Sequence, residues 1–600
     1  MTARDDTPSD DPILGAVQAA APVSSAPSPD RTDDGDAGDG HDDGEGERPQ
    51  LGAAEWALIK QCVAQGTHDI GNSRRFRFRC GHEVIHIQNV GWHVYDGRRW
   101  IEDIDGVHIT PLVHRTVEAI ALEAHLIEPT EREAAAIELG DAAQAMKDSV
   151  NWAEAGEADK AQLPELNRQI AAGSRARKAV ANRKAQRRRF ANSACNTGKI
   201  DGMLKQSIGF LSKPLAEFDV DPLALNLENG TLRIRVVETE DEESDPTDPR
   251  YRREVSIALE EHRRDDWICK LAPVGHDPKA ACPIFDAFLA RILPEPSIRD
   301  YMLRYLGYAL TALTMEQVFV LLHGEGRNGK STLVDIVSRI AGDYATSLPI
   351  ATLTGEDRRK GAEATPDLVR TPGARLVRAA EPKEGMAFDE SLIKSLTSGE
   401  PILVRRLNHE FNEVYPKFKL LISANRKPVI KGNDDGIWRR VVLIPFDVQI
   451  PKDEIDKKLP DKLWAERAGI LNRLLGGLSD FLQRGALDPP AAIQAASQEY
   501  RDESDQMGAF VREALIVTKQ PHDTETAGAL VEAMTVWCRK AGLTPFKPNT
   551  ITRRLPKTAH DFGFEKAKSS TSIYVGVQIR DEFKASDDDG RWPSRTHRDD

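Results

Sequence analysis

The apolar runs in the middle of the chain predict a buried sheet flanked by helices. Gln317–His323 is a mostly apolar run of strand length, and Ser331–Ile340 carries apolar residues at helical spacing. Gly373–Glu381 is expected to be the second core strand, Phe418–Asn425 the next, and Val441–Phe446 another. Strands that alternate with helices predict an α/β fold for this region.

The regions before this sheet alternate between mixed and helical patterns. Glu83–Gln88 and Gly91–Trp100 predict a strand pair around an Asp-Gly turn. Residues 129–206 are rich in Ala, Glu, Lys and Arg, which predicts helices. Glu238–Arg253 is a polar insertion that predicts an exposed loop, and helical spacing returns at Pro283–Leu313.

After the sheet, residues 462–515 predict helices only, and residues 521–583 predict helix, helix and a strand pair. That second order is typical of a winged-helix-like domain. We therefore expect seven segments: a disordered acidic tail at 1–50, a mixed α/β N-terminal domain at 51–234, a linker and helical collar at 235–315, the α/β core at 316–450, a helical subdomain at 451–515, the winged-helix-like domain at 521–583, and a disordered tail at 584–600.

The first segment carries most of the chain's negative charge. Residues 1–48 hold 13 Asp/Glu and 3 Arg, a net charge of −10, out of −14 for all 600 residues. Only −4 is left for the other 552 residues, so the acidic composition does not exclude nucleic acid as a partner of the rest. The tail has no periodic apolar pattern and is expected to be a solvated leader.

Cysteine usage and hydropathy restrict the class of protein further. The six cysteines, at positions 62, 80, 195, 269, 282 and 538, are widely spaced and form no C-x-x-C pair. This argues against a disulfide framework and against a zinc ribbon, and it fits a reducing cytoplasm. No apolar stretch is long enough to span a membrane, so we expect a soluble cytoplasmic protein with no membrane partner.

The segment between the first predicted strand and helix fits G-x-x-x-x-G-K-[ST] at every fixed position. A glycine loop between a strand and a helix presents backbone N–H groups and a positive dipole end to a triphosphate. Lys330 is expected to reach the β- and γ-phosphates and Ser331 the magnesium ion, so ATP and Mg²⁺ are the predicted cofactors. The expected nucleotide-contacting residues are Gly324, Glu325, Gly326, Arg327, Asn328, Gly329, Lys330, Ser331 and Thr332.

Hydrolysis requires more than a phosphate loop, and candidates follow in chain order. Glu381 ends a predicted strand, and we expect it to orient the magnesium ion and the attacking water. Asn425 ends the next strand, where a polar sensor would contact the γ-phosphate, although alone it would be a turn residue. Arg439 and Arg440 precede a further strand. One of them could complete the site of a neighbouring subunit, or both could form ion pairs at a subunit edge.

Two basic segments are candidates for nucleic acid contact. Residues 396–411 predict two short strands around a polar tip, and Arg405, Arg406, Asn408 and His409 would touch a single strand passing through a ring. On local sequence alone this is an ordinary surface hairpin. Residues 173–190 form a basic run that is either a solvated helix face or a phosphate-binding surface.

In this order the motifs resemble those of the superfamily 3 helicases. More narrowly, they are similar to the phage and plasmid primase–helicases related to the satellite-phage primase and the poxvirus helicase-primase. The strings that carry the resemblance are GEGRNGKST, ARLVRAAEPKEG, LIKSLTSGEPILVRRLN, FKLLISANRKP and DDGIWRRVVLIPF. Weaker similarity extends over residues 70–580.

The resemblance implies an AAA+-like P-loop ATPase core that assembles as a hexameric ring and moves 3′→5′ along single-stranded DNA at a replication fork. It implies that Lys330 and Ser331 hold phosphate and metal, that Glu381 is catalytic, that Asn425 is the sensor, and that Arg439 or Arg440 is an arginine finger acting on a neighbour's nucleotide. A hairpin in the pore and a DNA-binding winged helix are also implied.

Two departures from the family pattern matter. Glu400 stands where Asp is usual, a mild change. Many members also carry a primase domain ahead of the helicase, whereas no metal-binding acid pair or cysteine cluster occurs there in this sequence. We therefore expect an ATP-dependent DNA helicase for replication of a phage or mobile element, with primers from a separate primase or polymerase. One alternative is a primase–helicase that also transfers nucleotides. The other is an origin-binding or loading protein in which ATP only drives assembly, without strong helicase turnover.

Overall fold

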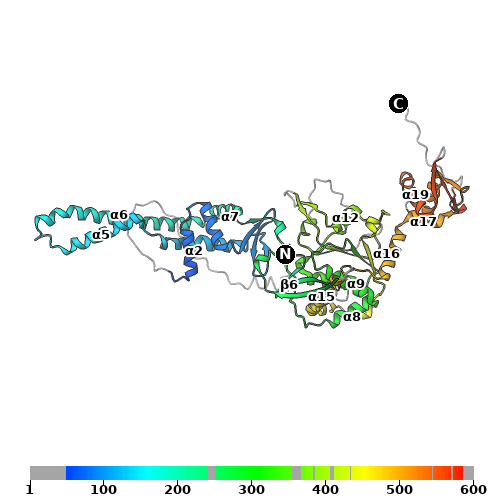
Figure 1. Cartoon of the computed structure of the whole chain (residues 1–600), viewed down its shortest axis with the longest axis horizontal. Coiled ribbons are helices and arrows are strands. Elements are labelled where there is room, and N and C mark those ends of the chain that lie inside the picture. Colours follow the sequence, from blue (N-terminus) through cyan, green and yellow to red (C-terminus); the bar gives the residue numbers. More distant parts are fainter. Residues whose placement is uncertain are drawn as a thin grey trace, which may run out of the picture. The chain divides into compact units, whose positions relative to one another are not determined.

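The computed structural model describes residues 49–240, 251–354, 367–380, 382, 386–405, 411–432, 434–543, 545–568 and 572–584. A five-stranded parallel sheet forms the centre of the middle region (Figure 1). Its strands are β8 (Phe319–His323), β9 (Ala345–Ser347), β10 (Leu376–Ala380), β13 (Lys419–Ala424) and β14 (Val441–Pro445). They lie in the order β14-β8-β13-β10-β9, and every pairing between neighbours is parallel.

Both faces of this sheet are covered, as the continuous apolar strands require. Phe319 and Leu321 of β8 pack in one apolar cluster, and Val320 and Leu322, which point the other way, pack in a second. The helices of this region are α10 (Lys330–Ala341), α11 (Ile350–Thr354), α12 (Glu390–Ser398) and α13 (Asp435–Trp438). The predicted α/β architecture of this region is confirmed.

One expectation about the core strands is wrong. We expected Gly373–Glu381 to be the second strand, but β9 comes between β8 and β10 in the chain and forms the far edge of the sheet. The segment escaped detection because it has only three residues, Ala-Thr-Ser, whose side chains are small or polar and not fully buried. An edge strand of this length has no apolar signature.

Four helices pack beside the sheet: α8 (Pro283–Ile292), α9 (Pro296–Tyr308), α14 (Leu459–Ala465) and α15 (Arg467–Arg484). α9 and α15 approach very closely. A Cβ at Gly307 would lie 2.4 Å from the Leu474 carbonyl oxygen, and one at Gly477 would lie 2.2 Å from the Leu303 carbonyl oxygen. The predicted collar and the first part of the helical subdomain therefore form one packed layer.

The N-terminal region contains a small mixed sheet in the order β3-β2-β1-β4, made by β1 (Val84–Ile87), β2 (Gly91–Tyr95), β3 (Trp100–Glu102) and β4 (Ser212–Lys213). The predicted Asp-Gly turn is present and joins β2 to β3. The helices are α2 (Ala53–Val63), α3 (Asp69–Cys80), α4 (Ile109–Glu118), α5 (Glu131–Ser149), α6 (Glu157–Ala194) and α7 (Thr197–Leu211), with a 3₁₀ segment η1 (Ala119–Leu126). Helices over residues 129–206 are thus confirmed.

Within the predicted exposed loop Glu238–Arg253, residues 238–240 and 251–253 are strand, and residues 241–250 lie outside the described part of the chain. A three-stranded antiparallel sheet consists of β5 (Ala224–Leu227), β6 (Gly230–Glu240) and β7 (Tyr251–Glu260). The boundary expected at residue 234 therefore falls inside β6. The two ends of the predicted loop were missed as strand because their side chains are polar and solvated, and a cross-strand ion pair, Arg253–Glu238 at 2.8 Å, joins them.

The last described region begins earlier than the expected residue 521. α17 (Gln506–Ala514) and β15 (Leu515–Val517) share an apolar core with the helices that follow, and the Phe510 ring lies 6.1 Å from the Trp537 ring. The other elements are β16 (Thr524–Thr526), α18 (Ala527–Lys540), α19 (Pro548–Phe562), β17 (Glu565–Lys568), β18 (Ser572–Val575) and β19 (Val577–Ile579), and α16 (Ala491–Ser504) precedes them. Helix, helix and strand pair occur in the predicted order.

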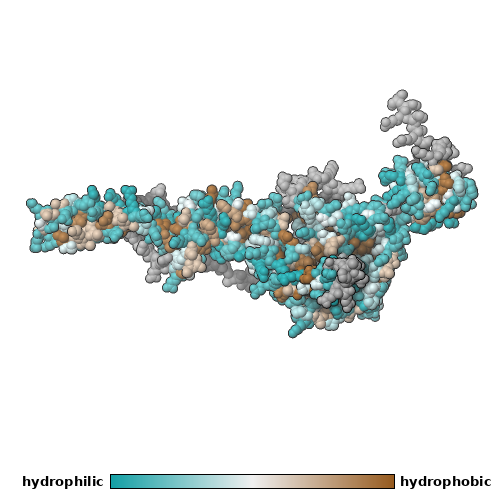
Figure 2. All heavy atoms as spheres, viewed as in Figure 1, coloured by the Kyte–Doolittle hydropathy of each residue, from teal (hydrophilic) through white to brown (hydrophobic). Residues whose placement is uncertain are grey.

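The surface that Figure 2 shows is mainly hydrophilic, in agreement with the polar and charged composition of the chain. On the face shown in Figure 2 hydrophilic residues predominate and the hydrophobic patches are small and scattered. Among the described residues, every helix is too short or too polar to cross a bilayer.

Candidate nucleotide site

The glycine-rich loop joins β8 to α10 at the carboxyl edge of the parallel sheet. α10 begins at Lys330, and Gly329 before it has a φ angle of 81°, a conformation that favours glycine. A Cβ at Gly329 would lie 2.5 Å from Ile292 Cγ2, so the loop also packs tightly on α8. The first turn of a helix leaves backbone N–H groups free to bind an anion. The predicted strand, loop and helix are confirmed, and nucleotide binding stays a prediction.

Lys330 is buried at this helix start and its ammonium group faces the neighbouring strand. The side chain is 4 % exposed. Its Nζ donates to the Gly324 carbonyl oxygen, to Asn328 Oδ1 at 3.1 Å and to Asn425 Oδ1 at 3.2 Å. The lysine therefore connects the loop to the end of β13.

Asn328 supports the lysine from within the loop. Its Oδ1 accepts the Lys330 hydrogen bond, and its Nδ2 donates to the Phe446 carbonyl oxygen at 3.2 Å, just after β14. Gly324 lies against the same carbonyl group, since a Cβ there would be 2.3 Å from the Phe446 oxygen. Asn328 thus links Lys330 to the segment that follows β14 and helps to hold the lysine in place.

The remaining loop residues are more open. Glu325, Gly326, Arg327 and Ser331 are exposed, and Thr332 is half-buried. The Arg327 carbonyl oxygen accepts a hydrogen bond from the Ile450 backbone N–H at 2.7 Å, which fixes the outer side of the loop. These exposed residues lie on the outer side of the loop, at the carboxyl edge of the sheet.

Asn425 stands where the sequence placed it, at the carboxyl end of β13, and it is the residue that meets Lys330. Glu381 lies outside the described residues. The last residue of β10, Ala380, pairs with Ser423 of β13, two residues before Asn425. The catalytic and metal-binding roles of Glu381 stay predictions.

His323 at the end of β8 was not singled out from the sequence. Burial lowers its pKa below the ordinary histidine value, and the positive charges of Lys427 and Lys330 lower it further. Lys427 is held by Glu503 at 2.7 Å. The sequence could have pointed to His323 because it comes directly before the glycine loop, and to Lys427 because it follows the turn at Asn425.

The structure separates the two candidate arginines. Arg440 is 6 % exposed and donates to Thr397 Oγ1 at 3.2 Å, to the Gly436 carbonyl oxygen at 2.6 Å and to Gln317 Oε1 at 2.9 Å. The Arg440 guanidinium therefore donates all of these hydrogen bonds to residues of its own chain. The structure thus favours Arg439 over Arg440 as the candidate finger, and the finger role itself stays a prediction.

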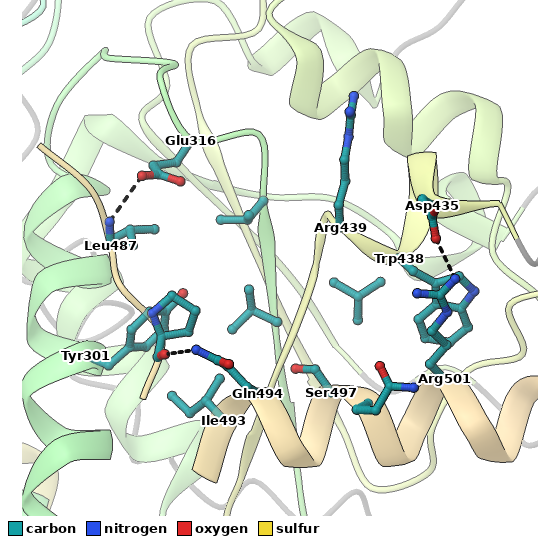
Figure 3. A pocket seen from close by; sticks show the side chains of 15 residues that line it. Tyr301, Glu316, Asp435, Trp438, Arg439, Leu487, Ile493, Gln494, Ser497 and Arg501 are labelled. Atoms are coloured by element: carbon teal, nitrogen blue, oxygen red, sulfur yellow. Dashed lines mark hydrogen bonds and ion pairs between the residues drawn. The ribbon is translucent and has the colours of Figure 1, made fainter. Parts of the chain in front are cut away.

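Arg439 is exposed and lies at a pocket of about 530 Å³ that Tyr301, Trp438 and Arg501 also line. Figure 3 shows its side chain directed away from the neighbouring Asp435–Arg501 ion pair, whose atoms are 2.6 Å apart. Val441 at the start of β14 pairs with Phe319, at the edge opposite the loop. A five-residue strand spans about 13 Å, so Arg439 and Lys330 occupy opposite edges of one sheet.

The predicted hairpin is present, with β11 (Ile402–Arg405) antiparallel to β12 (Phe411–Val414). Arg405 is the last residue of β11 and pairs with Phe411. Arg406, Asn408 and His409 fall on the tip, outside the described residues. The strands thus confirm a hairpin, and DNA contact by these four residues stays a prediction.

Comparison with known proteins agrees with these motifs. A family model described as D5 N terminal like matches residues 73–294, and a family of unknown function (DUF5906) matches residues 322–440. The second match contains Lys330, Asn425 and Arg439.

Several viral proteins are similar to parts of this chain. The chain is 31% identical over 248 residues to "Putative helicase L207/L206" of Acanthamoeba polyphaga mimivirus, which covers 38% of this chain and 26% of that protein. It is 27% identical over 271 residues to "Putative helicase 022R" of Frog virus 3, covering 42% and 27%. It is 27% identical over 154 residues to "Putative primase C962R" of African swine fever virus, covering 26% and 16%. The chain thus matches about a quarter or less of these relatives' lengths.

Among solved structures, the apo C-terminal region of NrS-1 matches 51% of this chain and 79% of that chain, with 11% identity and a TM-score of 0.32, which is too low to support an argument. The D5 N-terminal-like match and the similarity to these viral helicases and this viral primase together support a relationship between this chain and the primase–helicases.

Proposed function

We propose that this chain is an ATP-dependent DNA helicase that moves 3′→5′ on single-stranded DNA during replication of a phage or mobile element. The observation that carries the proposal is the 3.2 Å contact between Lys330 Nζ and Asn425 Oδ1. It brings a loop lysine and a strand-end amide together at one point, where a γ-phosphate would meet both. The viral relatives named as helicases point to the same activity.

The strand order supports an AAA+-like superfamily 3 core with ATP and Mg²⁺ as cofactors. β8 lies between β13 and β14, so its loop is flanked by the carboxyl ends of both neighbours. Ligands of open α/β sheets bind outside these ends. In this arrangement Ser331 and Glu381 hold the magnesium ion, Glu381 orients the attacking water, and Asn425 senses the γ-phosphate.

We further propose that the chain assembles as a ring, hexameric as the family resemblance implies, and the position of Arg439 supports this. It cannot reach the nucleotide of its own subunit from the opposite sheet edge, but a neighbouring copy could bring its own loop to that edge. Arg439 is then the finger and Arg440 its structural support. In mixtures of Arg439→Ala and wild-type chains, DNA-stimulated ATPase activity should fall faster than the mutant fraction rises. A fall in simple proportion would contradict a trans-acting finger.

DNA contact is assigned to two elements. The tip between β11 and β12 would follow the single strand through the ring. The last domain would bind DNA as a winged helix, because Arg553 and Lys557 of α19, and Lys547 just before it, are exposed basic residues. Primers would come from a separate primase or polymerase.

The test is ATP hydrolysis by the purified chain with and without single-stranded DNA, followed by unwinding of forked duplexes of either polarity. Stimulated hydrolysis and unwinding of only the 3′→5′ substrate are expected. Hydrolysis that Lys330→Ala leaves intact would overturn the site. ATP-dependent assembly on DNA without turnover would favour the loading protein instead.

A primase–helicase is the second candidate, because one matched relative is named as a primase. The distinguishing assay is incubation of the chain with a single-stranded template and all four NTPs. Labelled oligonucleotide products would establish primer synthesis by this chain, and their absence under conditions that support ATP hydrolysis would leave the helicase.

A further inference from the structure

The second half of α6 has an unusual charge composition. Residues 166–194 contain nine Lys or Arg and no Asp or Glu. A solvated helix face ordinarily mixes both signs, which gives i, i+4 ion pairs. Here the negative charges must come from other elements or from a partner.

Part of this positive charge is used inside the protein. α6 packs antiparallel on α5 through Gly140 and Gly173, where an added Cβ would lie 3.0 Å from the opposite helix. Arg183 pairs with Glu133 at 2.6 Å, and this pair together with the Thr130 backbone N–H lowers the Glu133 pKa to about 2. Arg177 pairs with Asp141 of α5.

Arg187 pairs with Glu123 of η1. The contacts of Gly173, Arg183 and Arg187 therefore define which side of α6 faces its own domain.

The opposite side carries a second set of cations. At 3.6 residues per turn, Arg175, Lys178 and Arg189 fall within roughly 60° of one another, and Arg183 and Arg187 point to the other side. Arg188 lies about 80° from the nearest of these three residues, toward the side that carries Arg177. All four residues are exposed, and no carboxylate among the described residues pairs with them. We call Arg175, Lys178, Arg188 and Arg189 the α6 stripe.

We propose that the α6 stripe binds the phosphate backbone of duplex DNA, without reading its sequence. The stripe extends about 21 Å along a rigid helix, which matches a run of phosphates on a groove edge. Its exposed side has no aromatic residue, since Phe190 packs on the inner side against Arg75. Stacking on aromatic rings is the usual means of holding single strands, so duplex is favoured. Only the choice of DNA rests on the proposed function.

The experiment uses the full chain without ATP and measures binding to a random-sequence 20-bp duplex at increasing salt. Four phosphate contacts give a slope of about −3.6 in log K against log salt, or about a 100-fold loss of affinity between 50 and 200 mM. The variant with all four residues changed to Gln should lose that part of the salt dependence. Each single change should lower the slope by about 0.9.

Arg177→Gln is the matched control for Arg175→Gln, because it removes the same charge from the same helix at a position already paired with Asp141. It should change the slope by less than a third as much. An unchanged slope in the fourfold variant, or an equal loss of affinity for a single strand of the same length, would overturn the proposal. Lys330→Ala should bind the duplex like wild type. Failure of ATP hydrolysis is therefore a separate result from failure of the stripe.

Discussion

Lys330 Nζ lies 3.2 Å from Asn425 Oδ1, which links the first residue of α10 to the residue that follows β13. Neither residue is near the other in sequence. If the ammonium also binds the β- and γ-phosphates, Lys330→Ala removes a buried cation aimed at charge that develops in the transition state. ATP hydrolysis should fall by about 100-fold or more. Steady-state phosphate release measures it, and Lys60→Ala on the exposed side of α2 is the control.

The two asparagines around Lys330 should differ in their kinetic effect. Asn425 would contact the reacting phosphate, so Asn425→Ala should lower kcat by about 100-fold with little change in KM for ATP. Asn328 instead holds Lys330 and the Phe446 carbonyl group. Asn328→Ala should therefore mainly raise KM, by misplacing the loop. Equal changes in both parameters for both variants would contradict this division.

Arg439 and Arg440 should separate stability from activity. Arg440→Met leaves the buried Thr397 and Gly436 oxygens without their donor and should lower the free energy of unfolding by about 1–3 kcal/mol. Arg439→Met removes an exposed side chain and should stay within about 0.5 kcal/mol of wild type, while ATPase activity is lost. Urea midpoints and phosphate release, measured on the same preparations, check both expectations.

The N-terminal domain contains a buried ion pair that provides a further test. Arg75 Nε and Glu123 Oε1 are 2.7 Å apart and both side chains are 1 % exposed. Glu123→Leu leaves Arg75 buried without its carboxylate, and such a loss costs about 3–5 kcal/mol. Asp141→Asn breaks an exposed pair instead and should cost under about 1 kcal/mol. Both losses of stability are measured in urea denaturation, as the shift of the first unfolding midpoint of each variant relative to wild type.

The sequence predicted the parts of the fold that have strong local signals. β8, α10 and β13 are long apolar runs next to a glycine loop, so their type and order followed directly. The proximity of Lys330 and Asn425 could be predicted only because parallel strands have their carboxyl ends at the same edge of a sheet. β9 and the ends of β6 and β7 had no such signal, since small or polar residues leave periodicity undefined.

Side-chain partners were the least predictable feature. Arg439 and Arg440 are adjacent and chemically identical, and only packing shows that Arg440 points into its own subunit. The α6 stripe is a similar case. The composition shows nine positive charges, but which of them meet α5 depends on the Gly140–Gly173 contact, and two glycines on separate helices have no shared sequence pattern.

The final prediction concerns pH. The pKa of His323 lies below the ordinary histidine value because of burial and then because of the nearby Lys427 and Lys330. Below the unfolded pKa of about 6.5, the unfolded chain binds a proton that the folded chain resists. His323 therefore makes the free energy of unfolding decrease as pH falls below about 6.5, with no effect well above it.

His323→Gln should remove part of this decrease. Urea midpoints at pH 7.5 and pH 5.5 measure it, and the difference between the two midpoints should be smaller in the variant than in wild type. His86 and His276 also have pKa values lowered by burial, so some pH dependence will persist. His522→Gln is the control, because that side chain is 77% exposed. If both variants keep the full wild-type difference, the pKa of His323 is not lowered in the folded chain.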